Sequence, residues 1–128
     1  MIVVDNTIAY LYIQGQRTAQ AEKVLMKDNE WIAPLLWRSE FMSVLALCFR
    51  QGTLSLDDAL VVAEAAQQFM QDSAASSGAS MVSTSKCSSY DCEFVALAEN
   101  FKVPLITSDK ELLKNFPSIA ISMEKFVV

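Results

Sequence analysis

The sequence has 128 residues, of which 52% are hydrophobic and 20% are charged, and its formal net charge at pH 7 is −5. This length and composition predict a single domain with one core, spanning residues 1–128. The acidic excess lies entirely after residue 50, because the first fifty residues carry equal numbers of acidic and basic side chains. This charge balance argues against a broad basic surface for nonspecific nucleic-acid binding, and it leaves open an acidic site that recruits cations.

Histidine is absent from the whole sequence. Its absence excludes Ser–His and Cys–His catalysis and the helical zinc-protease motif, so acid–base or metal chemistry must rest on carboxylates. The three cysteines are an odd number, and Cys48 lies in an apolar run, which favours reduced thiols and a cytoplasmic location. The longest apolar runs reach about half of the ~20 residues that a membrane span needs.

The first part of the chain alternates short strands with helices. Residues 2–4 form an apolar run closed by Asp5, which is typical of a buried parallel strand. A short helix at 8–13, an amphipathic helix at 18–28 and a second strand at 31–33 are expected to follow. The next helix, residues 35–50, is apolar over much of its circumference, so we expect it to lie centrally in the fold.

The second part continues the alternation. Ser55 and Asp58 have the spacing of a capping box, which predicts a helix from there to about residue 71. Residues 73–89 are serine-rich and read as a connector with a weak helix at 79–86. A helix from Asp91, a strand at 103–106, a short helix at 111–115 and an edge strand at 119–123 complete the chain. This order predicts an α/β fold, with a mostly parallel central sheet covered on both faces.

Four acids are predicted to lie at the same place in the fold, the carboxyl edge of this sheet. Asp5 and Asp109 follow strands, while Glu40 and Asp91 lie near the starts of helices. Two carboxylates about 5 Å apart repel by roughly 3 kcal/mol at an effective dielectric of ~20, so such a cluster must bind a cation or hold protons. All-oxygen ligands favour Mg²⁺ or Mn²⁺, and the natural chemistry of such a site is phosphoester hydrolysis.

Each acid taken alone also has a structural explanation. Asp5 fits a turn after a strand, Asp91 fits the first turn of a capped helix, and Asp109 follows a capping residue at Ser108. Glu40 is the hardest to explain in this way, because large apolar residues flank it. Their joint placement in a strand–helix pattern, more than any single acid, favours the metal site.

Three stretches of the sequence resemble the PIN-domain family, particularly its VapC-like toxin ribonucleases. They are IVVDNT at the amino terminus, PLLWRSEFMSVLAL in the middle, and SSYDCEFVALAENFKVPLITSDKELL near the end. The resemblance implies a PIN-like three-layer α/β/α fold, and the four acids of the family fall on Asp5, Glu40, Asp91 and Asp109. Thr7 and Thr107 match hydroxyl residues that accompany the first and last acids.

The resemblance also implies a function. Proteins of this kind are Mg²⁺- or Mn²⁺-dependent ribonucleases and are commonly homodimers. An antitoxin wraps around them and often places a basic side chain into the acidic pocket. By this resemblance Asp5, Asp91 and Asp109 would bind the metal, and Glu40 would complete the cluster and position or deprotonate the attacking water. Thr7 and Thr107 would hold the acids in place through hydrogen bonds.

Two rival functions stay open at this point. The first is a PIN-like scaffold that no longer cleaves RNA and acts by binding a partner protein, and metal binding at the acids distinguishes it from a nuclease. The second is a metal-dependent phosphatase of the haloacid-dehalogenase type. Such enzymes need a second aspartate two residues after the first, where this chain has Thr7.

Overall fold

A five-stranded parallel sheet forms the centre of the molecule. The computed structural model describes residues 1–73 and 89–128, without the side chains of residues 71–73 and 89–91. The strands lie in the order β3-β2-β1-β4-β5, and every neighbouring pair is parallel. They are β1 (Ile2–Val4), β2 (Trp31–Pro34), β3 (Gln71–Ser73), β4 (Leu105–Ile106) and β5 (Ala120–Ile121). The expected α/β class with a parallel central sheet is confirmed.

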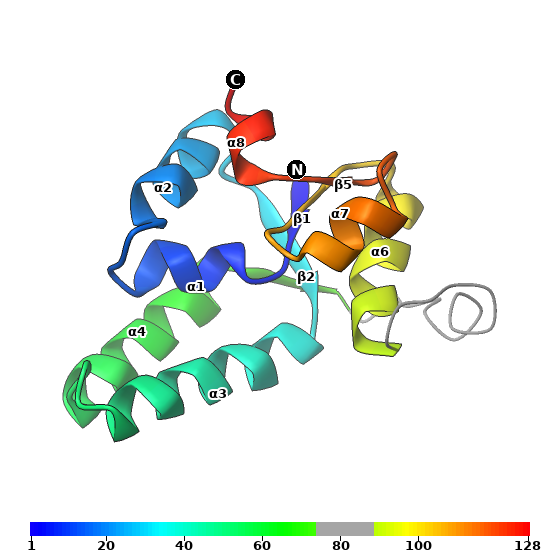
Figure 1. The fold of residues 1–128 in the computed structure, drawn as a ribbon. Coiled ribbons are helices and arrows are strands. Elements are labelled where there is room, and N and C mark those ends of the chain that lie inside the picture. The colour runs from blue at the N-terminus through cyan, green and yellow to red at the C-terminus, as the bar shows by residue number, and fades with distance from the viewer. Residues whose placement is uncertain (74–88) are drawn as a thin grey trace.

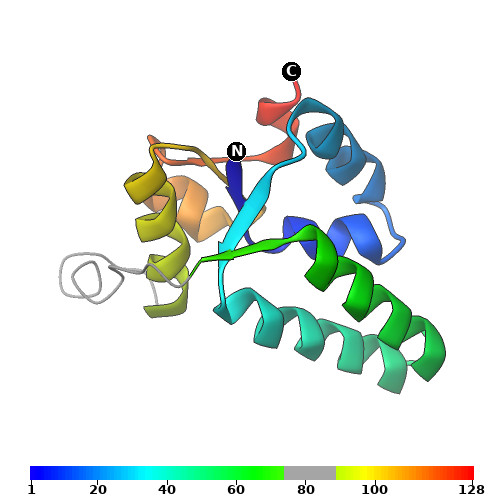
Figure 2. The same cartoon turned by 180° about the vertical axis from the view of Figure 1, so that it is seen from behind.

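Helices cover both faces of this sheet. They are α1 (Thr7–Tyr12), α2 (Thr18–Lys27), α3 (Leu36–Arg50), α4 (Leu56–Phe69), α6 (Ser89–Phe101), α7 (Lys110–Asn115) and α8 (Met123–Phe126). Figure 1 shows α6 and α7 on one side of the strands and α1 and α2 on the other, and Figure 2 shows the same layers from behind. The expected three-layer arrangement is therefore confirmed.

The central strand β1 carries the middle of the core. Its three residues are Ile, Val and Val, and each is at most 1% exposed. Strand β1 pairs with β2 on one side and with β4 on the other, where Val4 lies opposite Ile106. A strand that is buried on both faces suits a continuous apolar run. The residues that follow β1 and β4 consequently emerge side by side at the carboxyl edge of the sheet.

Helix α3 differs from expectation, because it is not central. Only Trp37, Phe41 and Leu45, spaced four residues apart, are buried. Four other large apolar residues of the helix are exposed: Met42, Val44, Leu47 and Phe49, the last of which is 44% exposed. Figure 1 shows α3 and α4 as an adjacent pair that reaches away from the sheet. The apolar surface of this helix is thus larger than the fold itself covers.

Two further elements were not expected from the sequence. Residues 71–73 form the edge strand β3, although they are polar, because they pair with β2. The chain after β5 forms the helix α8, capped by Ser122, whose side chain accepts from the backbone N–H of Lys125. The last strand is correspondingly shorter than predicted, although it does lie at the sheet edge. The weak helix expected at 79–86 lies outside the described residues.

The cysteine expectation is wrong at one position. Cys48 is a free thiol, but Cys92 is disulfide-bonded.

Within residues 1–73 and 89–128, no helix combines the length and apolar character that a membrane crossing requires.

Candidate active site

Asp5 is the best-defined acid at the carboxyl edge of the sheet. It follows β1 directly, and both of its carboxylate oxygens accept hydrogen bonds. The backbone N–H of Asn6 donates to Oδ1 and the hydroxyl of Thr107 donates to Oδ2, each at 2.5 Å. Two donors from different turns fix the orientation of this carboxylate before any ligand arrives, which is the kind of preorganisation a binding site needs.

Thr107 connects the turn after β1 with the turn after β4. Its side chain is fully buried, and its oxygen also accepts from the backbone N–H of Asp109 at 3.0 Å. One hydroxyl therefore joins the first predicted acid to the backbone of the last. The expected hydrogen bond of Thr107 to an acid is present at Asp5, whereas the hydrogen bond that Thr7 donates goes to a backbone carbonyl and not to an acid. Thr7, also fully buried, donates to the carbonyl of Ile106 at 3.3 Å and so secures the same two turns to each other.

The environment of Asp5 makes its charge costly. Burial raises the pKa of this carboxyl to about 7 from its ordinary value of 3.8, and the nearby charge of Glu40 adds to the rise. The hydrogen bonds from Thr107 and from the Asn6 N–H lower the pKa, but burial outweighs them. Near neutral pH, a cation or a proton beside Asp5 would relieve this cost.

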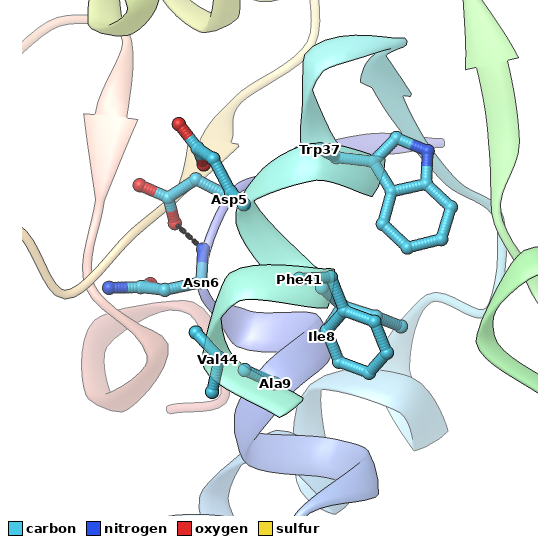
Figure 3. A pocket seen from close by; sticks show the side chains of 8 residues that line it. Asp5, Asn6, Ile8, Ala9, Trp37, Phe41 and Val44 are labelled. Atoms are coloured by element: carbon cyan, nitrogen blue, oxygen red, sulfur yellow. Dashed lines mark hydrogen bonds between the residues drawn. The ribbon is translucent and has the colours of Figure 1, made fainter. Parts of the chain in front are cut away.

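A small hollow of about 90 Å³ adjoins Asp5. Figure 3 shows Asp5 and Asn6 on one side of it and the rings of Trp37 and Phe41 on the other. Glu40 lines the same hollow, although its residue is exposed overall. Helix α3 thus brings Glu40 from the carboxyl end of β2 to the first acid, as the strand–helix pattern predicts.

Asp109 caps α7 instead of following a cap. Its Oδ1 accepts from the backbone N–H of Glu111 at 2.9 Å, so the expected capping residue Ser108 is not the cap. One oxygen of Asp109 is therefore committed to the helix, while Thr107 holds its backbone beside Asp5. Asp91 is the third residue of α6, and its side chain lies outside the described part. Among the side chains that are described, no three acids or other ligating groups form a cluster able to hold a metal ion.

The residues present fit a hard cation in their chemistry. Asp5 and Glu40 offer only oxygen donors, and burial, with a further contribution from the charge of Glu40, raises the pKa of Asp5. Mg²⁺ and Mn²⁺ prefer oxygen donors of this type, and Mg²⁺ usually needs only one or two carboxylates besides water. The roles of Asp5, Glu40, Asp91 and Asp109 as ligands stay predictions.

The parallel sheet order and the helices on both faces define a three-layer α/β/α domain. The structure can be superposed on PAE2754 from Pyrobaculum aerophilum with a TM-score of 0.75, at 19% identity, over 98% of this chain and 92% of that one. It also matches a chain of a toxin–antitoxin complex from Klebsiella pneumoniae, with a TM-score of 0.69 at 15% identity, over 96% of this chain and 98% of that one. At these identities the likeness is one of fold.

The sequence itself is similar to Ribonuclease VapC3 of Pyrobaculum aerophilum. The two are 29% identical over 126 residues, which cover 92% of this chain and 96% of the relative. No family model matches the sequence. The resemblance to VapC-like ribonucleases, expected from the three sequence stretches, is confirmed.

Proposed function

We propose that this chain is a metal-dependent endoribonuclease, the toxin of a toxin–antitoxin pair. The observation that carries the proposal is the placement of Asp5 and Glu40 on one hollow at the carboxyl edge of the sheet. The named function of the relative, a ribonuclease, and the toxin–antitoxin complex that shares the fold both support it. The alternative is a scaffold that binds a partner protein and cleaves nothing.

The proposed chemistry is hydrolysis of an RNA phosphodiester bond by water. Asp5, Asp91, Asp109 and Glu40 would hold Mg²⁺ or Mn²⁺, which lowers the pKa of bound water and neutralises developing charge when it is present. The chain itself orients Asp5 through Asn6 and Thr107. Glu40, which lines the same hollow as Asp5, would position the attacking water or accept its proton.

Metal binding separates the nuclease from the scaffold. We expect calorimetric titration with Mn²⁺ to detect binding to the purified chain, and at least a tenfold weakening in Asp91→Asn, because the variant loses a charged ligand. The matched control is Asp57→Asn, an exposed acid in the first turn of α4, which should bind as the wild type does. Absence of binding to a folded wild type would contradict the nuclease and favour the scaffold.

The exposed apolar surface of α3 and α4 supports a protein partner. Met42, Phe49, Leu56 and Leu60 line a groove of about 290 Å³ between the two helices, and Leu60 is 56% exposed. Contiguous apolar surface of this kind marks interaction sites more often than ordinary surface. We propose that a second copy of the chain covers this face in a homodimer, and that the antitoxin binds the assembled toxin.

Light scattering tests the homodimer. We expect the isolated chain to be a dimer and Leu60→Lys to be a monomer of unchanged fold, because the charge would have to be buried at the contact. Met26→Lys is the matched control, since Met26 is 87% exposed on α2, away from the groove. If Leu60→Lys remained dimeric, the contact between copies would have to lie on another surface.

A further inference from the structure

Two buried polar atoms at the carboxyl edge of the sheet have no hydrogen-bond partner. They are Oδ1 of Asn6 and Oγ of Ser108. In the part of the chain that is described, only Arg17 Nε and Gln20 Oε1 share this condition. Buried polar groups are nearly always paired, so an unpaired group beside a predicted active site needs an explanation.

The fold places these two residues on neighbouring turns. Asn6 follows Asp5 after β1, and Ser108 follows Thr107 after β4. Because Val4 lies opposite Ile106 in the sheet, and Thr107 donates to Asp5, the two turns run beside each other past the last pair of the sheet. Figure 3 shows the Asn6 side chain next to Asp5 and directed away from the ring of Phe41.

Helix capping does not explain Asn6. It is the N-cap residue of α1, a position where asparagine usually accepts a hydrogen bond through its side chain. Here the side chain makes no capping bond, and the helix uses only the backbone carbonyl, which accepts from Ala9 and Tyr10. The carboxamide oxygen is therefore left unpaired on a residue that lines the same hollow as Asp5 and Glu40.

We propose that Asn6 and Ser108 bind one ribonucleotide of the RNA substrate, with Asn6 recognising its ribose 2′-hydroxyl. This inference rests on the proposed nuclease function. An amide oxygen can only accept a hydrogen bond, and a phosphodiester group offers acceptors but no donor. The 2′-hydroxyl is a donor that RNA has and DNA lacks. The Ser108 hydroxyl donates, which suits a phosphate oxygen of the same nucleotide.

The two residues consequently have different tasks. A phosphate contact holds any nucleic-acid strand, whereas a 2′-hydroxyl contact distinguishes RNA from DNA. Asn6 is thus a specificity-determining residue and Ser108 a positioning residue. By this division, neutral hydrogen-bonding groups beside the acids would distinguish RNA from DNA.

Binding of defined probes tests this division. The probes are a random-sequence 20-nucleotide RNA and the corresponding DNA, each fluorescently labelled and measured by anisotropy with Ca²⁺, after a gel has verified that the strands stay intact. We expect the wild type to prefer RNA by about threefold to tenfold, the range of one neutral hydrogen bond. Asn6→Ala should lose the preference by weakening RNA binding alone, and Ser108→Ala should weaken both probes by a similar factor.

Two further variants complete the design. Asn6→Asp keeps an acceptor oxygen and should retain the RNA preference while binding both strands more weakly, because its charge repels phosphate. Gln20→Ala is the matched control, since it removes an equally unpaired amide oxygen from α2, and it should bind as the wild type does. Circular dichroism verifies the fold of each variant.

The outcomes separate this inference from the proposed function. In one outcome, the wild type prefers RNA, Asn6→Ala removes this preference, and the wild type cleaves no RNA with Mg²⁺ or Mn²⁺. This outcome would support the inference and overturn the proposed nuclease function. In another outcome, the wild type cleaves RNA but binds RNA and DNA equally, or prefers RNA by a factor that Asn6→Ala leaves unchanged. This outcome would support the proposed nuclease function and overturn the inference. A wild type that binds neither probe and cleaves nothing would overturn both.

Discussion

Asp5→Asn is expected to reduce RNA cleavage by more than about a hundredfold. Changes to residues that merely orient a metal ligand cost ten- to a hundredfold in affinity or activity, and loss of the ligand's charge should cost more. Asp5 is the acid whose orientation the structure fixes most completely, because both oxygens accept hydrogen bonds. Cleavage of a labelled RNA with Mn²⁺, by wild type and variant under single-turnover conditions, measures the loss.

The fold of this variant is not expected to suffer. An asparagine at position 5 can still accept the N–H of Asn6 through its oxygen, and its amide can donate to the oxygen of Thr107. Asp57→Asn again serves as the control, because it makes the same chemical change on an exposed turn of α4. Full cleavage by a folded Asp5→Asn would contradict the assignment of Asp5 to the metal site.

The sequence predicted the part of the fold in which local pattern and tertiary environment agree. The apolar run at Ile2–Val4 became the buried central strand, and the spacing of Ser55 and Asp58 became a real cap at the start of α4. In both places a few adjacent residues are enough to predict the local structure, and contacts with distant parts of the chain do not change it. The same agreement brought Asp5 and Glu40 to one hollow.

The elements that the sequence missed depend on distant partners. Strand β3 consists of Gln71–Ser73 and has no apolar pattern, so only its pairing with β2 makes it a strand. The apolar composition of α3 predicts a central, buried helix, whereas only three of its residues are buried. A pattern of residues reports that a surface is apolar, but it does not report whether the same chain or another molecule covers that surface.

The details of the site were the least predictable. Ser108 and Asp109 are both good capping residues, and the structure assigns the cap to Asp109 and leaves the Ser108 hydroxyl unpaired. Asn6 is likewise a common capping type whose side chain does not cap. Propensity names the residues that suit a position, whereas the geometry of neighbouring turns decides which of them is used.

The second large effect is a dependence of stability on pH that Asp5 imposes on the metal-free protein. Burial raises its pKa to about 7 in the folded state, against an ordinary value of 3.8, so the folded state binds more protons than the unfolded state between these pH values. Stability contributed by this group is therefore fully present below about pH 4 and is lost as the pH rises toward 7. The loss is about 1.4 kcal/mol for each unit of pKa difference, a few kcal/mol in total.

Denaturant unfolding in EDTA at pH 4.5 and at pH 8 measures this effect. We expect the wild type to lose stability relative to Asp5→Asn as the pH rises, so that the inactive variant is the more stable protein at pH 8. Mn²⁺ at pH 8 should restore the stability of the wild type and leave that of Asp5→Asn nearly unchanged, because the cation offsets the buried charge that the variant lacks.

If the stability of the wild type relative to the variant were the same at both pH values, the charge of the Asp5 carboxylate would not destabilise the folded state. The case for a cation beside Asp5 would then rest on its oxygen donors alone. Asp5 thus connects the two predictions, since the charge that destabilises the folded chain is the charge that the proposed metal requires.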